Sequence, residues 1–170
     1  NLIDWLELGI NRLSIGIQSL KKEDLNWMNR GHSEQDALSS ISLALKTGFK
    51  NISADLMYGL PGLTKNEWDK HLNLVVNSGI THLSAYCLTL EKGTVLAHKV
   101  KTGNTILPED DQIELQYNAL ITKLLSAGFE QYEVSNFAYN KMYSLHNSSY
   151  WKSINYIGVG PSAHSFSAGY

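Results

Sequence analysis

Arg12-Leu-Ser-Ile-Gly-Ile-Gln18 and Ile52-Ser-Ala-Asp55-Leu-Met-Tyr58 are the two stretches that decide the fold of this chain. In both, apolar residues alternate with small or polar ones, which is the period of a strand with two different faces. The first stretch ends on Gln18, and the second carries Asp55 shortly before the turn Gly59-Leu-Pro-Gly62. Barrel-type α/β enzymes place ligand-binding side chains at strand ends of this kind.

Working outward, one unit recurs four times: an amphipathic helix, a glycine, an apolar residue and a strand. Its junctions are Gly9-Ile10, Gly48-Phe49, Gly79-Ile80 and Gly128-Phe129. A glycine just past a helix accepts the left-handed conformation that closes the helix C-terminus. The unit predicts helices that alternate with strands over residues 12–18, 52–58 and 82–88.

Local signals mark where three of these helices begin. Ser33 with Asp36, and Thr64 with Glu67, have the spacing of a capping box, in which each side chain bonds the other residue's backbone N–H. Pro108 precedes a third helix, and proline suits a first helical turn.

Helices between successive strands imply right-handed crossovers and a parallel sheet. If that sheet is part of a barrel, Gln18 and Asp55 share its inner face near the rim. The alternative is an ordinary α/β sheet in which Asp55 caps a turn.

The character of the sequence changes after Glu91, so we divide the chain into residues 1–91 and 92–170. The segment 92–108 reads as a loop, because it contains Gly93, Gly103, Asn104 and Pro108. Residues 129–138 read as a strand, and 139–170 as an added lobe over the barrel mouth.

The composition excludes several classes of protein. The chain has 170 residues, a net charge of -2 and a single cysteine, Cys87. There is no basic excess that would favour nucleic acid, and no apolar run of about 18 residues that would span a membrane. One cysteine permits neither an internal disulfide nor a multi-cysteine metal site, and a cytoplasmic location is the default. Because the chain starts at Asn1 in what reads as a helix, we expect a fragment of a longer protein.

Further motifs follow the first two in order along the chain. They are Asn29-Arg30-Gly-His32, Leu107-Pro-Glu-Asp-Asp111, Glu130-Gln-Tyr-Glu-Val-Ser-Asn136, His146-Asn147-Ser-Ser-Tyr150-Trp151 and Gly158-Val-Gly-Pro-Ser-Ala-His164. Together with the two strands, they resemble the radical S-adenosylmethionine (SAM) proteins related to oxygen-independent coproporphyrinogen III oxidase. The last two motifs narrow the resemblance to the haem-chaperone branch.

This resemblance implies a partial (β/α)6 barrel, whose later strands this chain supplies, with a C-terminal α+β extension. The earlier strands would carry a Cys-x3-Cys-x2-Cys loop that holds a 4Fe–4S cluster, and that loop is absent here. Gln18, Arg30 and Asp55 match the family's SAM contacts. Without the resemblance, Arg30 reads as a solvated surface arginine. Cys87 reads as a small buried hydrophobe rather than an iron ligand.

His146 is the candidate haem ligand, since a neutral imidazole binds haem iron well. Tyr150 and Trp151 would offer the porphyrin a flat apolar wall. The alternative is that His146 bonds to a loop while Trp151 packs on the barrel. No residue is singled out as catalytic.

The resemblance thus implies a haem chaperone that carries SAM and the cluster and passes haem to an acceptor protein, including a membrane-associated one. A second hypothesis is an oxidase that decarboxylates coproporphyrinogen III. A third is a non-radical α/β-barrel protein that binds a small metabolite.

Overall fold

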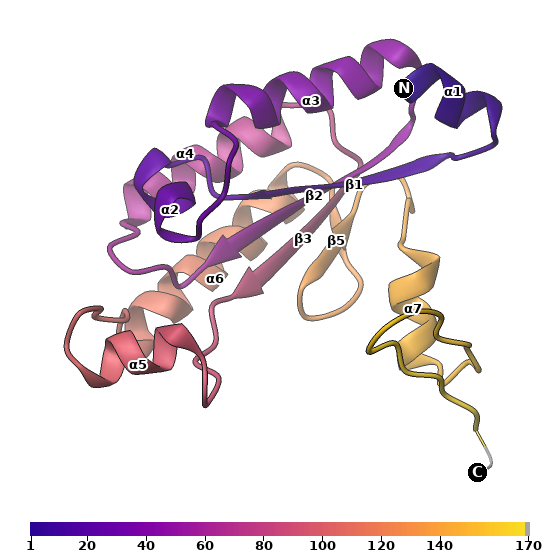
Figure 1. Ribbon diagram of the computed structural model, residues 1–170. Coiled ribbons are helices and arrows are strands. Elements are labelled where there is room, and N and C mark those ends of the chain that lie inside the picture. The colour runs from indigo at the N-terminus through magenta and orange to yellow at the C-terminus, as the bar shows by residue number, and fades with distance from the viewer. Residues whose placement is uncertain (169–170) are drawn as a thin grey trace.

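A five-stranded mixed sheet forms the centre of the computed structural model, which describes residues 1–168 (Figure 1). The strands lie in the order β1-β2-β3-β5-β4. Their bounds are β1 (Arg12–Gln18), β2 (Asn51–Tyr58), β3 (His82–Cys87), β4 (Glu130–Gln131) and β5 (Asn136–Ala138). The first three strands are parallel, and β5 and β4 join them antiparallel. Because β1 and β4 are edge strands, the sheet does not close into a barrel within the described residues.

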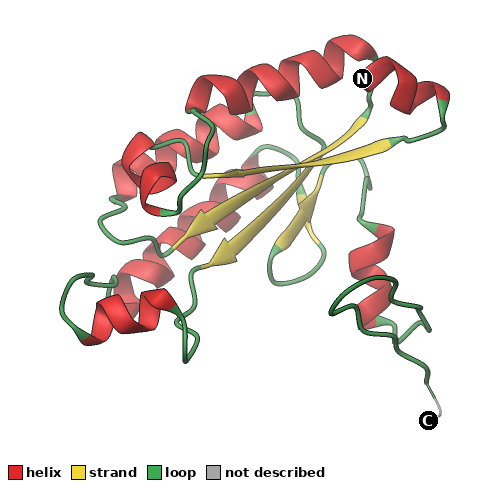
Figure 2. Ribbon diagram, viewed as in Figure 1, coloured by secondary structure: helices red, strands yellow, loops and turns green. Residues whose placement is uncertain are grey.

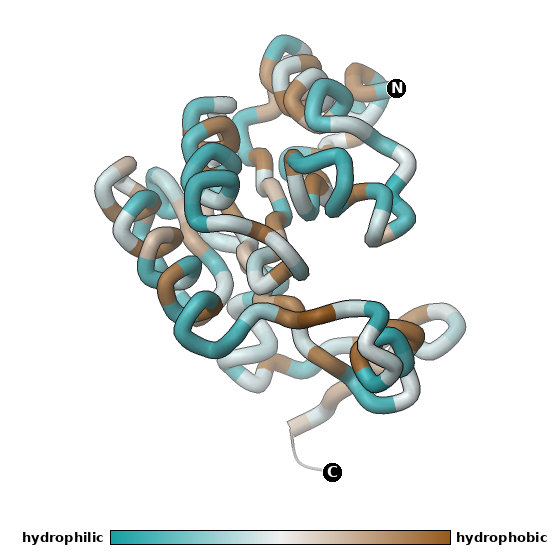
Figure 3. Tube along the Cα trace, turned by 90° about the vertical axis from the view of Figure 1, so that its left-hand side faces the viewer, coloured by the Kyte–Doolittle hydropathy of each residue, from teal (hydrophilic) through white to brown (hydrophobic). Residues whose placement is uncertain are grey.

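Helices α3, α4 and α6 cover one face of the sheet, while α7 lies on the other side (Figure 2). The helices are α1 (Leu2–Glu7), α2 (Lys22–Trp27), α3 (Glu34–Thr47), α4 (Lys65–Val76), α5 (Val95–Lys101), α6 (Asp110–Ser126) and α7 (Leu145–Trp151). Hydrophilic and hydrophobic residues alternate along the helices (Figure 3), as expected for helices with one buried face.

Two of the three predicted helix starts are confirmed. Ser33 and Thr64 are the N-caps of α3 and α4, and both capping boxes are complete. Each box satisfies two backbone N–H groups that have no partner within the helix. The four predicted junction glycines all have positive φ, for example 114° at Gly48.

The alternation seen in the sequence divides the sheet into an apolar and a polar face. Ile52, Ala54 and Leu56 of β2 are fully buried in the core that the covering helices share. Trp68 of α4 is also fully buried, and its indole N–H donates to the Gln116 carbonyl at 2.8 Å. The opposite face carries the polar residues of the same strands. A ligand bound on that face would therefore meet hydrogen-bonding groups.

Three predicted elements differ from the structure. Residues 92–108 are not only loop, because Thr94 caps the short helix α5. The strand predicted over 129–138 is two strands, since residues 132–135 turn the chain back between β4 and β5. Helix α6 begins at Asp110 with Glu109 as its N-cap, so Pro108 precedes the cap instead of filling the first turn.

The C-terminal segment is attached at the amino ends of the parallel strands. Arg12, the first residue of β1, donates to the Met142 carbonyl at 3.3 Å. Just before β3, the Thr81 carbonyl accepts from the Tyr139 N–H at 2.9 Å. Figure 1 shows α7 beyond this end of the sheet. We expected the lobe over the barrel mouth, at the carboxyl ends; the bonds that fix its start are at the opposite ends.

Candidate functional site

Gln18 ends β1 at the carboxyl edge of the sheet, where a bulge interrupts the pairing with β2. Its φ is 66°, and the register shifts between Gly16 and Gln18. The Gln18 amide folds back over Gly16, because a Cβ built on that glycine would lie 2.9 Å from Nε2. Gly16 is the register partner of Asp55, so the bulge places the Gln18 amide beside the position of Asp55 on β2.

Asp55 lies half-buried on the polar face of β2. The Ser14 hydroxyl lies 3.3 and 3.2 Å from its two carboxylate oxygens. Burial raises the pKa of Asp55 above its ordinary value, while hydrogen bonding from Ser84 and Ser14 and the charge of Arg12 act in the opposite direction. A half-buried carboxylate with weak local partners can accept bonds from a ribose, an ammonium or an amide.

Arg30 is exposed in the loop between α2 and α3. Its backbone N–H donates to the Leu25 carbonyl at 2.8 Å, and His32 bonds the carbonyl of Ile17 at 3.0 Å, which returns the loop to the end of β1. Within residues 1–168, the guanidinium makes no hydrogen bond or ion pair. Gln18 and the loop that carries Arg30 therefore lie at the carboxyl end of β1, and Asp55 lies within β2 opposite Gly16. No hydrogen bond or ion pair joins these three side chains within residues 1–168.

An ion pair ties two loops together at this carboxyl edge. Lys21, which precedes α2, lies 2.8 Å from Glu67 in the capping box of α4. Hydrogen bonds from Lys21 and Thr64 lower the pKa of Glu67 to about 2. In the first loop, the Ser19 hydroxyl donates to the buried carboxylate of Asp24 at 2.7 Å. These contacts fix the loops that flank Gln18.

The turn that begins at Gly59 is held by a residue that the sequence did not single out. The buried Gln116 amide of α6 accepts from the Gly59 N–H at 2.8 Å and donates to the Leu63 carbonyl at 2.9 Å. Gly59 has a φ of 71° and packs close to the thiol of Cys87. Because Gln116 lies 57 residues from Gly59, no local sequence pattern predicts these bonds. We call the two hydrogen bonds of the Gln116 side chain the Gln116 clamp.

A second polar group lies at the amino ends of the strands and was also missed. The fully buried His82 bonds Ser53 at 2.8 Å through Nδ1 and the Tyr132 hydroxyl at 2.7 Å through Nε2. Tyr132 in turn accepts from the Ser144 N–H at 3.2 Å. Burial, together with the charge of Arg12, lowers the pKa of His82 to about 3. We assign this group to fastening the C-terminal segment to the sheet.

His146 lies on α7, and Figure 1 shows this helix away from the carboxyl ends of β2 and β3. Ser144 caps the helix, and its hydroxyl accepts from the Asn147 N–H at 3.3 Å. The His146 imidazole is exposed, with Nε2 3.1 Å from the Tyr150 hydroxyl and the two rings 5.0 Å apart. The predicted site residues thus form two separate groups.

Exposed apolar side chains surround His146 in the sequence. They are Leu145, Tyr150, Trp151, Ile154, Ile157, Val159 and Phe166. Trp151 is 70% exposed, so it does not pack on the sheet. An open hollow of about 820 Å³ lies beside them, lined by Asn155, Tyr156, Ile157, Ser165, Phe166 and Ser167. An exposed imidazole among apolar and aromatic groups fits the chemistry of haem.

The residues do not fit an iron–sulfur cluster. Within residues 1–168, no three His, Cys, Asp or Glu side chains gather in a metal-binding group. Cys87 is half-buried, and burial raises the pKa of its thiol, which disfavours the thiolate that iron needs. The side chain packs as the small hydrophobe that the sequence suggested.

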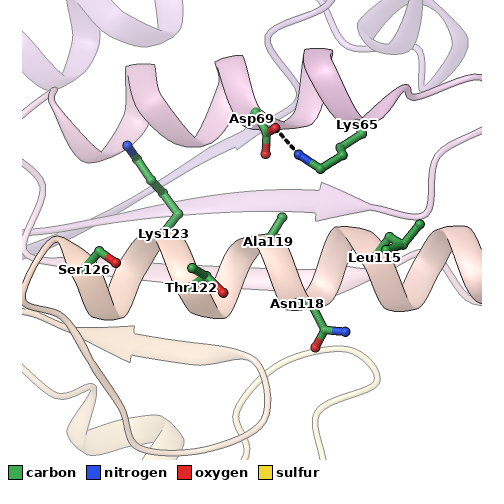
Figure 4. Close-up of a pocket in the computed structure, with 8 residues that line it drawn as sticks. All are labelled: Lys65, Asp69, Leu115, Asn118, Ala119, Thr122, Lys123 and Ser126. Carbon is green, nitrogen blue, oxygen red and sulfur yellow. Dashed lines mark hydrogen bonds and ion pairs between the residues drawn. The ribbon is translucent and has the colours of Figure 1, made fainter.

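A groove of about 520 Å³ lies between α4 and α6, away from both groups of site residues. Figure 4 shows its residues on the two helices, with Lys65 bonded to Asp69 at 2.6 Å. It contains none of the predicted site residues. Across the described part of the chain, every helix is too short or too polar to cross a bilayer.

Comparisons with known proteins identify the family of this chain. The sequence model of the Radical SAM superfamily matches residues 2–75. Radical S-adenosyl methionine domain-containing protein 1, mitochondrial, of Danio rerio is 43% identical over 96% of this chain and 37% of its own length. Heme chaperone HemW of Bacillus subtilis is 37% identical over 96% of this chain and 43% of its own length. The chain therefore spans about two fifths of these curated relatives.

Among solved structures, coproporphyrinogen III oxidase (HemN) from Escherichia coli shares the fold. It superposes with a TM-score of 0.77 over 98% of this chain and 42% of its own, at 24% sequence identity. That match confirms an α/β fold of the radical SAM barrel type, although the five strands here form an open sheet. The chain belongs to the radical SAM superfamily, as a homologue of the proteins named heme chaperone HemW and radical SAM domain-containing protein 1.

Proposed function

We propose that this chain is part of a radical SAM haem chaperone, in which His146 binds haem iron and the protein passes the haem to an acceptor. The observation that carries the proposal is the exposed imidazole on an apolar surface, in a chain 37% identical to a protein named heme chaperone. Membership of the radical SAM superfamily leaves the non-radical metabolite-binding barrel without support.

Exposure of the site suits transfer rather than permanent retention of haem. Trp151 and Ile157 are 70% and 86% exposed, so they can cover a porphyrin face without enclosing the ligand. Partial burial limits the affinity and speeds dissociation, since differences in affinity arise mostly from the dissociation rate. A chaperone must release its cargo to an acceptor protein, and a membrane-associated acceptor could approach such a surface directly.

The carboxyl edge of the sheet would bind SAM. Gln18 offers an amide, Asp55 a half-buried acceptor, and Arg30 a two-pronged donor suited to the methionyl carboxylate. A reduced 4Fe–4S cluster bound next to SAM would supply one electron for reductive chemistry on it. The cluster's ligands are not in this chain, and we propose a regulatory or assembly role for SAM in the intact protein.

We propose that the functional division falls at residue 91. Residues 1–91 then hold the SAM edge, and 92–170 hold the haem surface. The two parts share one sheet, because β5 pairs with β3. A cytoplasmic location stays a prediction, since the relatives include a protein named as mitochondrial as well as bacterial ones. The absence of a nucleic-acid partner also stays a prediction from the charge.

The second candidate is an oxygen-independent coproporphyrinogen III oxidase. The solved oxidase shares the fold, but 24% identity carries no argument for its activity here. Conversion of coproporphyrinogen III by the full-length protein under anaerobic conditions would support this alternative.

An anaerobic haem titration of the full-length protein, followed at the Soret band, tests the chaperone proposal. We expect saturable binding, weakened at least 10-fold by His146→Ala because the iron loses its ligand. His98→Ala is the matched control, since His98 is also exposed on a short helix and should leave binding unchanged. Equal affinity in wild type and His146→Ala would contradict the ligand assignment.

A further inference from the structure

An unbroken run of aromatic contacts joins α7 to the last motif of the sequence. Tyr150 packs edge-on against His146 with ring centroids 5.0 Å apart, and Tyr156 packs in the same manner on Tyr150 at 5.1 Å. Phe166 stacks on Tyr156 at 6.0 Å. Tyr150, which we expected to form part of an apolar wall, therefore lies within a row of four contacting rings. The row begins at Phe166 and ends at His146.

Backbone bonds hold the far end of this chain of rings. Tyr156 and Phe166 form a two-bond antiparallel bridge of 2.9 and 3.0 Å, which closes the loop that contains the Gly158–His164 motif. The loop depends on Gly158, because a Cβ there would lie 2.3 Å from the His164 carbonyl oxygen. The motif thus shapes a loop that fixes Tyr156 and, through it, Tyr150.

The Tyr150 hydroxyl contacts one nitrogen of His146 and leaves the other free. Nε2 lies 3.1 Å from that hydroxyl, and Nδ1 has no hydrogen-bond partner within residues 1–168. A neutral imidazole carries its proton on one nitrogen and a lone pair on the other. If Nε2 donates its proton to the tyrosine oxygen, the lone pair stays on Nδ1, where a metal can bind.

We propose that Tyr150 is a positioning residue that accepts the Nε2–H of His146 and so holds Nδ1 ready for haem iron; this inference rests on the proposed function. A hydrogen bond to the second nitrogen of a ligating histidine fixes the tautomer and ring orientation and raises the basicity of the ligand. The 156–166 loop buttresses the tyrosine.

Tyr150→Phe in the full-length protein tests the inference, because it keeps the ring and removes only the hydroxyl. Without haem, we expect ¹⁵N NMR of wild-type His146 to show a proton on Nε2, and the variant to show a mixture of tautomers. On haem addition, we expect affinity to fall about 10-fold with an imidazole-ligated spectrum retained. Tyr139→Phe is the control, since Tyr139 is also part-exposed but packs on Phe129 instead of His146.

Three results would overturn the inference. Unchanged tautomer and affinity in Tyr150→Phe would show that the hydroxyl does not position His146. Loss of the axial-ligand signature in Tyr150→Phe but not in His146→Ala would make the tyrosine the ligand. Failure of the wild-type protein to bind haem would overturn the proposed function and this inference together. The first result leaves the proposed function standing, and the second overturns its assignment of His146 as the ligand.

Discussion

His82 connects two distant parts of the fold, although no sequence pattern indicates this role. It is fully buried and bonds Ser53 on one side and Tyr132 on the other. Both ring nitrogens have partners, so the neutral ring is satisfied, whereas a protonated ring would place an uncompensated charge in the core. The sequence left it as an ordinary histidine, because its partners lie 29 and 50 residues away.

His82 predicts a loss of stability in acid. Its pKa is about 3 in the folded chain and that of His71 is about 4, against about 6.5 when unfolded. Below pH 6.5 the unfolded state binds protons that the folded state does not, so stability falls as the pH drops towards the folded values. Each histidine contributes a slope of about 1.4 kcal/mol per pH unit.

Chemical denaturation of the full-length protein between pH 6 and pH 5 measures this slope. We expect His82→Gln to reduce the pH dependence by the contribution of one histidine, and His71→Gln to do the same. The exposed His98→Gln serves as the control and should leave the slope unchanged. A slope that persists in full in His82→Gln would contradict the assignment of a buried, neutral imidazole.

At the scale of elements, the sequence predicted what local rules determine. The strand over residues 12–18 was predicted with its observed bounds, because alternation marks a strand with one buried face. The N-caps Ser33 and Thr64 were found because a capping box is contained within four residues. Helix α5 was missed because glycines flank it closely and its seven residues include no buried one.

The clamp between α6 and the Gly59 turn gives a prediction for one element. Gln116→Leu would leave the buried Gly59 N–H and Leu63 carbonyl without partners, so the free energy of unfolding should fall by about 1–3 kcal/mol. Gln112→Leu, an exposed change on the same helix, is the matched control. Urea denaturation of the full-length protein compares them; equal stability of the two variants would mean that the clamp is not a net stabilising contact.

For the whole molecule, the sequence indicated the candidate SAM and haem residues. It did not indicate that these two groups lie in separate parts of the fold. The parallel pairing of β1 and β2, which the alternation of helices and strands predicted, places Asp55 opposite Gly16, two residues before Gln18. The attachment of the segment before α7 at the amino ends of the strands was not predicted. It depends on a bond from Arg12 to the Met142 carbonyl and on one from the Ser144 N–H to the Tyr132 hydroxyl. Such contacts between distant parts of the chain leave no local pattern.

This separation underlies our proposal that the SAM residues and the haem surface are two separate sites. The most direct test measures SAM and haem affinities of the cluster-loaded full-length protein with Asp55→Ala and with His146→Ala. We predict that Asp55→Ala weakens SAM binding at least 10-fold and leaves haem binding unchanged, while His146→Ala does the reverse. If either substitution weakened both ligands equally, or neither weakened its own ligand, the assignment of two separate sites would be wrong.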